Sequence, residues 1–541
     1  MAEVFVNDVK SCMALSSQKR ERLRNMDLFV LDNSMRETTV GSLRAHTLDN
    51  KRAIYEEVKK AGFKHFVVES FSSETRIGDL FLEELIAAGE DLTNAFAFSE
   101  VWEKVENKVP LPDIPIGLIK CKRFGIKNVM FEMDLNFYKL DYEVFTMERL
   151  CEFARDKFAW VRENLGRDAM ISINIRDFSS CMKNHPDRVW YVVNYLSRLP
   201  IDERISGIAY EDIGRALNEE LGAWTSAVRQ EMVRSGWEDG HLIVHVHEQW
   251  GMVHTAALEC LASGATGIWA GVCLEGAGIG HADSTTTILN LIRLGNTAVT
   301  KKYNCKYLRE AAINVTKITT GKLPNPKQPI YGERALDMLF GFVFEAIFED
   351  NQDKVEYGGF DVAGFLGVTP KIRITTMASP AMVVCELNNV FGDDPQFTLD
   401  MGAEMLTQIL ENAADGRKEE YNSQAGLAML FDQAGGKLTP IMALAVEKSL
   451  TTAPHIDHLI AEIKSEWDVW NVNSKAEDAE DEMTFNSFYE GFMSPYFGCY
   501  RCEDTQQGLQ ALDMDNDGMI DWVEFRLYLK WAGRLINLDS S

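Results

Sequence analysis

The alternation of short hydrophobic runs with longer amphipathic segments, between about residues 25 and 300, constrains the fold of this chain most. Runs of strand-forming residues recur at Leu28–Leu31, His65–Glu69, Asn128–Phe131, Met170–Ile175, Gly207–Tyr210, Leu242–His247 and Gly267–Ala270. Segments with helical spacing, such as Lys51–Ala61 and Thr146–Leu165, lie between them. This alternation predicts parallel strands joined by helices, and about eight such units predict a closed (β/α)8 TIM barrel of the α/β class. A doubly wound open sheet is the structural alternative.

Charge and hydropathy exclude several classes of function. The 541 residues include 55 Lys and Arg against 82 Asp and Glu, so the formal net charge is −27. Such a surface repels nucleic acid and anionic membranes and attracts cations. The longest apolar run, Met338–Phe348, is interrupted by Gly341 and Glu345 and is too short to cross a bilayer. The ten cysteines are scattered, which suits a reducing compartment, and a cytoplasmic location is expected.

The pattern changes after about residue 300 and predicts three further regions. Gly321–Pro329 is a proline-punctuated linker, and residues 301–385 are expected to form a linker with a small α+β lid subdomain. Residues 386–460 have helical spacing. Residues 461–541 are predicted to be an all-α domain with a pair of EF-hands. The barrel itself is assigned to residues 25–300.

The histidines are concentrated near the end of the predicted barrel, where five of the ten occur at 241, 245, 247, 254 and 281. His245 and His247 lie two residues apart on a predicted strand, so both side chains point to the same face. Two imidazoles on one face can ligate a divalent metal together with a carboxylate. A hydrogen-bonded pair of core histidines is the alternative.

The sequence around these histidines resembles that of a superfamily of metal-dependent barrels. His245, His247 and Gly251 match a His-x-His-Asn-Asp-x-Gly pattern, which is followed, as here, by an alanine-rich helix and a glycine-rich loop. These motifs are similar to those of the DRE-TIM metallolyase superfamily. It includes isopropylmalate, homocitrate and citramalate synthases, hydroxymethylglutaryl-CoA lyase and pyruvate carboxyltransferase-like domains. The chain departs from the pattern at Glu248–Gln249, which replace Asn-Asp.

The resemblance extends to the first strand and implies a set of site residues. Arg36 matches the catalytic arginine that stabilises oxyanion charge, and Glu37 takes the place of the aspartate ligand. The implied ligands of a barrel metal (Zn, Mg or Mn) are Glu37, His245, His247 and His281, the last in place of a loop asparagine. The implied catalytic residues are Arg36, Glu69 and Asp177. The base stays unassigned among Glu69, Asp177 and His281.

The region after the barrel resembles the linker of the synthases, which favours a synthase over a lyase. The resemblance therefore implies an acyltransferase that condenses an acyl-CoA with a 2-oxo acid. Two departures matter: Asp337–Glu345 lacks the lid histidines of synthases, and Arg176 stands where a glutamate is usual. A retro-Claisen or retro-aldol lyase, and a calcium-dependent binding protein with an inactive barrel, are the alternatives. The expected partners are a 2-oxo acid, an acyl-CoA and calcium, and a homodimer is one expected assembly.

Residues 513–524 (DMDNDGMIDWVE) match the calcium loop of an EF-hand. The ligands would be Asp513, Asp515, Asp517, the Met519 carbonyl, Asp521 and Glu524. Ile520 is the apolar residue that would pair with a second loop, and residues 476–487, with Met483 at the same position, have that outline. The second loop lacks the turn glycine and the final glutamate, so it is expected to bind no calcium. An acidic surface turn is the alternative for residues 513–524.

Overall fold

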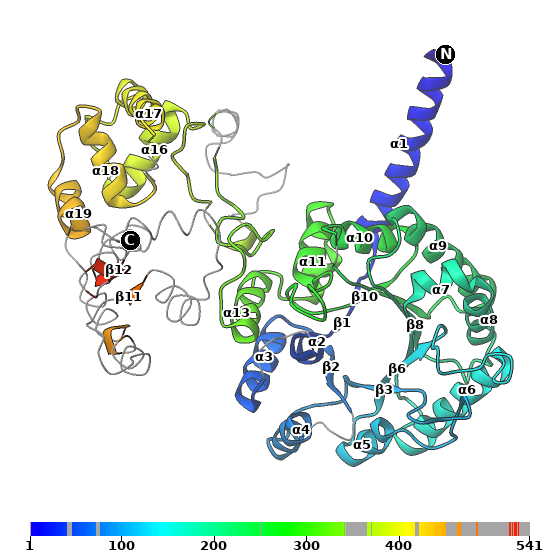
Figure 1. The fold of residues 1–541 in the computed structure, drawn as a ribbon. Helices are drawn as coiled ribbons and strands as arrows, with labels where there is room; N and C mark the ends of the chain where they lie inside the picture. The colour runs from blue at the N-terminus through cyan, green and yellow to red at the C-terminus, as the bar shows by residue number, and fades with distance from the viewer. Residues whose placement is uncertain are drawn as a thin grey trace. The chain divides into compact units, whose positions relative to one another are not determined.

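The computed structural model describes residues 2–40, 46–71, 76–248, 250–339, 341, 365–368, 370–416 and 421–450, and short stretches at 463–465, 467, 483–484, 519–520, 522, 524–526 and 529. The chain divides into two compact units (Figure 1). One unit comprises Met1–Leu336 and Glu356–Thr369, and the other comprises Asp337–Val355 and Pro370–Ser541. The predicted domain boundaries at residues 25, 300, 385 and 460 remain predictions.

Eight parallel strands close into a barrel in the first unit (Figure 1). Their order around the barrel is β1 (Phe29–Asp32), β10 (Gly267–Ala270), β9 (His241–Val246), β8 (Gly207–Asp212), β7 (Ile171–Arg176), β6 (Asn128–Asp134), β3 (Ala95–Glu100) and β2 (His65–Ser70). The predicted (β/α)8 barrel is confirmed, and the open sheet is wrong. Seven strands lie at the predicted runs. The eighth, β3, was missed because its sequence, AFAFSE, has alanines in place of β-branched residues.

Helix α1 precedes the first strand and projects from the barrel, and the helices that follow the strands surround it (Figure 1). The described helices of this unit are α1 (Ala2–Asn25), α2 (Ser34–Val40), α3 (Leu48–Lys60), α4 (Ile77–Ala87), α5 (Ile116–Phe124), α6 (Met147–Asn164), α7 (Phe178–Asn184), α8 (Pro186–Ser197), α9 (Asn218–Arg234), α10 (Val253–Ser263), α11 (Ser284–Arg293), α12 (Ala298–Lys302) and α13 (Leu308–Thr320). The helices α3 and α6 lie at the two predicted segments. Each begins at a threonine, Thr47 or Thr146, whose side chain caps a backbone N–H of the first turn. A small hairpin, β4 (Val105–Glu106) and β5 (Val109–Pro110), precedes α5.

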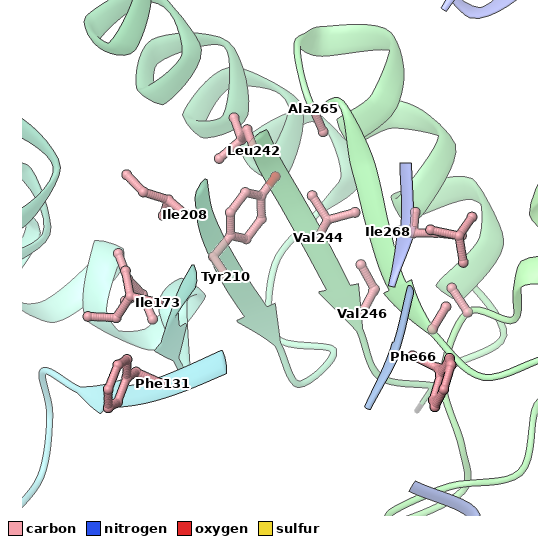
Figure 2. Close-up of a cluster of buried hydrophobic side chains, with 14 of the residues drawn as sticks. Phe66, Phe131, Ile173, Ile208, Tyr210, Leu242, Val244, Val246, Ala265 and Ile268 are labelled. Atoms are coloured by element: carbon pink, nitrogen blue, oxygen red, sulfur yellow. The ribbon is translucent and has the colours of Figure 1, made fainter. Parts of the chain in front are cut away.

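Strand side chains point alternately into the barrel and out toward the helices. One buried cluster contains strand residues only and therefore fills the lumen: Phe29, Leu31, Val67, Phe96, Phe98, Met130, Ala209, Ile243 and Trp269. The intervening strand residues pack with the helices in a separate cluster. Figure 2 shows several of these outward side chains, including Tyr210, Val244 and Ile268. The lumen is thus closed by an apolar plug, and polar inward residues such as Glu132, Glu211 and His245 lie beyond it, toward the carboxyl ends of the strands.

The second unit contains α16 (Pro380–Phe391), α17 (Leu399–Ala414), α18 (Gln424–Gln433) and α19 (Pro440–Leu450). Serine or threonine side chains cap the first three at Ser379, Thr398 and Ser423. Met382, Met405 and other apolar side chains form their common core. Two short strands, β11 (Met483–Thr484) and β12 (Met519–Ile520), pair in antiparallel register. Among the described residues of both units, none of the helices combines the length and the apolar character that a bilayer crossing requires.

Candidate metal centre

Three buried side chains from the two ends of the barrel sequence meet at the carboxyl ends of its strands. Glu37 lies in α2 directly after β1, His245 lies in β9, and His281 follows β10. One ligand atom of each lies within 4.8 Å of those of the other two. The His281 Nε2 is 3.3 Å from a Glu37 carboxylate oxygen, and the His245 Nε2 is 4.0 Å from the other oxygen. Because β1 and β10 are paired, barrel closure brings Glu37 and His281 together.

His245 is held in the tautomer and charge state that metal ligation requires. Its Nδ1 lies 2.7 Å from the backbone carbonyl of Trp269, so this nitrogen donates and Nε2 faces the other two side chains. Burial lowers the pKa of His245 to about 3, and the nearby imidazoles of His247 and His281 act in the same direction. The imidazole is therefore neutral near pH 7.

His281 is completely buried, and its Nδ1 has no hydrogen-bond partner among the described residues, whereas its Nε2 faces Glu37. A buried polar group of this kind is costly unless something else binds it. The loop before it is shaped around the ring: a Cβ on Gly276 would lie 2.2 Å from the His281 Nε2. Burial acts to raise the pKa of Glu37, but Arg36, His281 and His245 outweigh it and hold that pKa well below its usual range. An ionised carboxylate and two imidazoles fit a divalent metal ion.

His247, the fourth predicted ligand, lies beside this group but is paired with another residue. Its ring centroid is 4.7 Å from that of His245 and 5.4 Å from that of His281. Its Nε2 lies 3.3 Å from a carboxylate oxygen of Glu211. Burial acts to lower the pKa of His247, but the hydrogen bond and charge of Glu211 outweigh it and raise that pKa. Ligation by His247 stays a prediction.

Arg36, the residue predicted to stabilise oxyanion charge, lies beside the candidate metal ligands. Its Nε donates to the Ser70 hydroxyl at 2.6 Å, and the guanidinium forms an ion pair with Glu37. The guanidinium carbon lies 4.2 Å from the ring centroid of Phe98 and 5.3 Å from that of Trp269, two residues of the apolar plug. The plug, Ser70 and Glu37 thus fix the guanidinium beside the candidate metal ligands.

The two carboxylates predicted as catalytic have different surroundings. Glu69 forms a buried ion pair with Lys51 of α3, and its other oxygen accepts a hydrogen bond from the Ser70 amide at 2.9 Å. Asp177 precedes α7 with a left-handed backbone, at φ +47°, and its Oδ1 is buried without a hydrogen-bond partner among the described residues. Its Oδ2 lies 3.7 Å from Arg215. Strained backbone and a free carboxylate oxygen are both typical of functional positions.

Three further polar side chains, which no sequence motif indicated, lie beside His247 at the ends of the neighbouring strands. Glu132 of β6 and Glu211 of β8 each follow an inward apolar residue by two positions, and Asn174 lies between them on β7. Burial raises the pKa of Glu132 to about 7, and the negative charge of Glu211 adds to this rise. The period-two pattern, in which an apolar inward residue is followed by a polar one at the strand end, is a signal that could have identified Glu132 and Glu211, whereas Asn174 follows the polar Ser172.

The predicted calcium loop is described only in part. Met519, Ile520 and Glu524 are described, whereas Asp513, Asp515, Asp517 and Asp521 lie outside the described residues. Met483 pairs with Ile520 and Thr484 with Met519 in the β11–β12 ribbon. The ring of Trp522 lies 5.5 Å from that of Trp467 and 5.8 Å from that of Phe525.

Comparison with solved structures gives similar barrels at low sequence identity. Hydroxymethylglutaryl-CoA lyase from Pseudomonas aeruginosa is 15% identical, with a TM-score of 0.42 over 58% of this chain and 97% of that one. The HMG-CoA lyase from Brucella melitensis is 14% identical, with a TM-score of 0.41 over 54% and 99%. The carboxyl transferase domain of Rhizobium etli pyruvate carboxylase is 14% identical, with a TM-score of 0.38 over 83% and 74%. No family model and no curated protein sequence matches this chain. These identities are too low to transfer an activity.

Proposed function

We propose that the barrel is a divalent-metal-dependent enzyme that forms or breaks a carbon–carbon bond of a 2-oxo acid. The observation that carries the proposal is the group of Glu37, His245 and His281, buried at the end of the barrel where TIM-barrel enzymes place their active sites. A Zn, Mg or Mn ion held by these residues, with His247 beside them, would supply Lewis-acid polarisation of the substrate carbonyl.

The other roles fall to residues around this group. Arg36 stabilises negative charge that develops on the substrate oxygen, because its guanidinium is already oriented by Ser70 and the plug. Asp177 is the best supported of the three base candidates. Lys51 and the Ser70 amide bind the two carboxylate oxygens of Glu69, and His281 belongs to the candidate metal ligands. Asp177, in contrast, has one carboxylate oxygen without a hydrogen-bond partner among the described residues. Asp177 would remove a proton from the α-carbon of the second substrate.

We favour the synthase direction, in which an acyl-CoA condenses with the 2-oxo acid and free coenzyme A is released. The synthase-like linker after the barrel supports this direction. A retro-Claisen or retro-aldol lyase is the second candidate, because the same side chains serve the reverse reaction and Asp337–Glu345 contains no histidine. The two directions differ in one readout: only condensation releases a thiol from an acyl-CoA.

Metal content tests the proposal before any substrate is known. We expect about one barrel metal ion per full-length chain, lost in His245→Ala protein that keeps the circular dichroism of the parent. His241→Gln is the matched control, because His241 begins the same strand and its ring stacks on Phe29 in the plug. Full metal retention in His245→Ala, or equal loss in both variants, would reject the site. A screen of 2-oxo acids with acyl-CoAs, read by thiol release, then tests the reaction.

We also propose that residues 513–524 bind one calcium ion. The complete ligand pattern of the loop supports this proposal. The register of the β11–β12 ribbon also supports it, because Met483 pairs with Ile520 and the two residues occupy the same position in the two predicted loops. A calcium-binding protein with an inactive barrel would bind calcium and no barrel metal, so the metal analysis separates it from an enzyme.

A further inference from the structure

Four carboxylates and one guanidinium lie at the barrel mouth on the side of β3, β6, β7 and β8. We call the four carboxylates the acidic wall: Glu100, Glu132, Asp134 and Glu211. Strand register places Glu100 beside Glu132, and Asp134 beside Arg176. The Arg176 guanidinium forms an ion pair with Glu132 at 3.1 Å, and its side chain is 51% exposed. Among the described residues, the wall has two ion-pair partners, Arg176 on Glu132 and His247 on Glu211, and Glu100 and Asp134 have none.

An unsatisfied buried acceptor lies within the wall. Asn174 is completely buried, and its amide nitrogen lies 3.5 Å from a Glu132 oxygen and 3.3 Å from a Glu211 oxygen. This nitrogen donates to the carboxylates, so the other amide atom, Oδ1, is an acceptor, and it has no hydrogen-bond partner among the described residues. The wall thus combines four carboxyl groups, which outnumber their ion-pair partners, with a free acceptor, and a ligand that satisfies both must carry positive charge and N–H donors.

A second metal ion fits this wall less well than an organic cation. Among the described residues, the only set of three or more His, Cys, Asp or Glu side chains with ligand atoms within 4.8 Å of one another is the Glu37 group. The wall carboxylates are too dispersed to form another such set. Arg176 already shows which kind of cation the wall accepts, a planar guanidinium that reaches a carboxylate by hydrogen bonding.

We propose that the acidic wall, together with Asn174, is a subsite for a guanidinium or ammonium group on the substrate. The wall is joined to the candidate metal centre by a short series of contacts, from His247 to Glu211, from Glu211 to Asn174 and from Asn174 to Glu132. A 2-oxo acid that binds the metal through its head can therefore extend a tail of a few atoms to the wall. This inference rests on the proposed function, which supplies the 2-oxo acid head of the substrate. It adds the chemical class of the group at the other end of the substrate.

Three 2-oxo acids with the same head test the subsite: 5-guanidino-2-oxopentanoate, 2-oxohexanoate and 2-oxohexanedioate, with cationic, neutral and anionic tails. Their binding to full-length, manganese-loaded protein is measured by calorimetry. We expect the cationic acid to bind about 10- to 100-fold more tightly than the neutral one, the range for a charge-assisted hydrogen bond, and the anionic acid to bind most weakly.

Variants separate the subsite from a merely structural effect. Glu132→Gln should abolish most of the preference and leave the neutral acid unaffected. Glu152→Gln, on the exposed side of α6, is the matched control and should keep the preference. Arg176→Ala removes the resident cation and should strengthen binding of the cationic acid, a direction that loss of structure would not produce.

The outcomes distinguish failure of the subsite from failure of the proposed function. Equal binding of all three acids would overturn the subsite alone. Binding of none would overturn the proposed function, and butylguanidinium, which needs no metal, would then test the subsite. Its binding to the parent but not to Glu132→Gln would support the subsite, and its failure to bind the parent would overturn it. A second manganese ion lost in Glu132→Gln would also overturn it.

Discussion

Removing Lys51 should destabilise the barrel strongly without acting on the metal centre. Lys51 of α3 forms an ion pair with Glu69 of β2, and their side chains are only 3% and 8% exposed. Gly78 of α4 packs so closely on Glu69 that a Cβ there would lie 1.9 Å from its carboxylate oxygen. Water therefore cannot replace the ammonium group when Lys51 is changed to Met, and the Glu69 charge is left buried and unpaired.

The size of the effect follows from this burial. Loss of one partner of a buried ion pair lowers the free energy of unfolding by about 3–5 kcal/mol. Solvent screening does little to reduce this cost here, because both side chains are buried. For a domain of this size, each kcal/mol lowers the melting temperature by about 2–4 °C, so Lys51→Met should lower it by about 6–20 °C. Lys59→Met is the matched control on the same helix. Lys59 and Glu90 are 40% and 31% exposed, and loss of that pair should cost less than about 1 kcal/mol.

Calorimetric unfolding of the full chain measures both variants. The double variant Lys51→Met/Glu69→Leu should recover part of the loss, because no charge remains buried. A double variant whose destabilisation equals the sum of the two single changes would refute the reasoning. So would a Lys51→Met protein as stable as the Lys59→Met control. If Glu69 were instead the catalytic base, Glu69→Gln would abolish activity while leaving the melting temperature unchanged.

Three further predictions concern single residues. Arg36→Ala should lower kcat by about 10²–10³-fold with the fold retained, and activity within a few-fold of the parent would exclude the oxyanion role. Burial raises the pKa of Asp32 to about 7, although the backbone and side-chain hydrogen bonds of Ser34 oppose the rise. The proton on Asp32 therefore stabilises the fold fully below about pH 4, and this stabilisation is lost as the pH rises through 7. Asp32→Asn should flatten the pH dependence of the free energy of unfolding over that range. Calcium titration should change Trp522 fluorescence and fit one site with a dissociation constant of about 10⁻⁷–10⁻⁵ M. Glu524→Gln should weaken calcium binding sharply, and two equivalent sites would contradict the prediction.

Local sequence determined the class of fold and half of the metal centre. The alternation of apolar runs and amphipathic segments is a property of neighbouring residues, and it specified the parallel barrel even though one strand, AFAFSE, was overlooked. The spacing of His245 and His247 likewise predicts that both side chains share one face of a strand, without any tertiary contact.

Tertiary structure decided which of the candidate residues meet. Glu37 and His281 are 244 positions apart in the chain (281 − 37), and only the pairing of β1 with β10 places them 3.3 Å apart. The same folding buried Glu69 against Lys51 and assembled the acidic wall from the ends of three strands, β3, β6 and β8. Strand order and register depend on how the whole barrel closes, because each strand must bury one face in the lumen and the other under helices. No local pattern carries that information, and the chemistry of the barrel mouth therefore follows from closure.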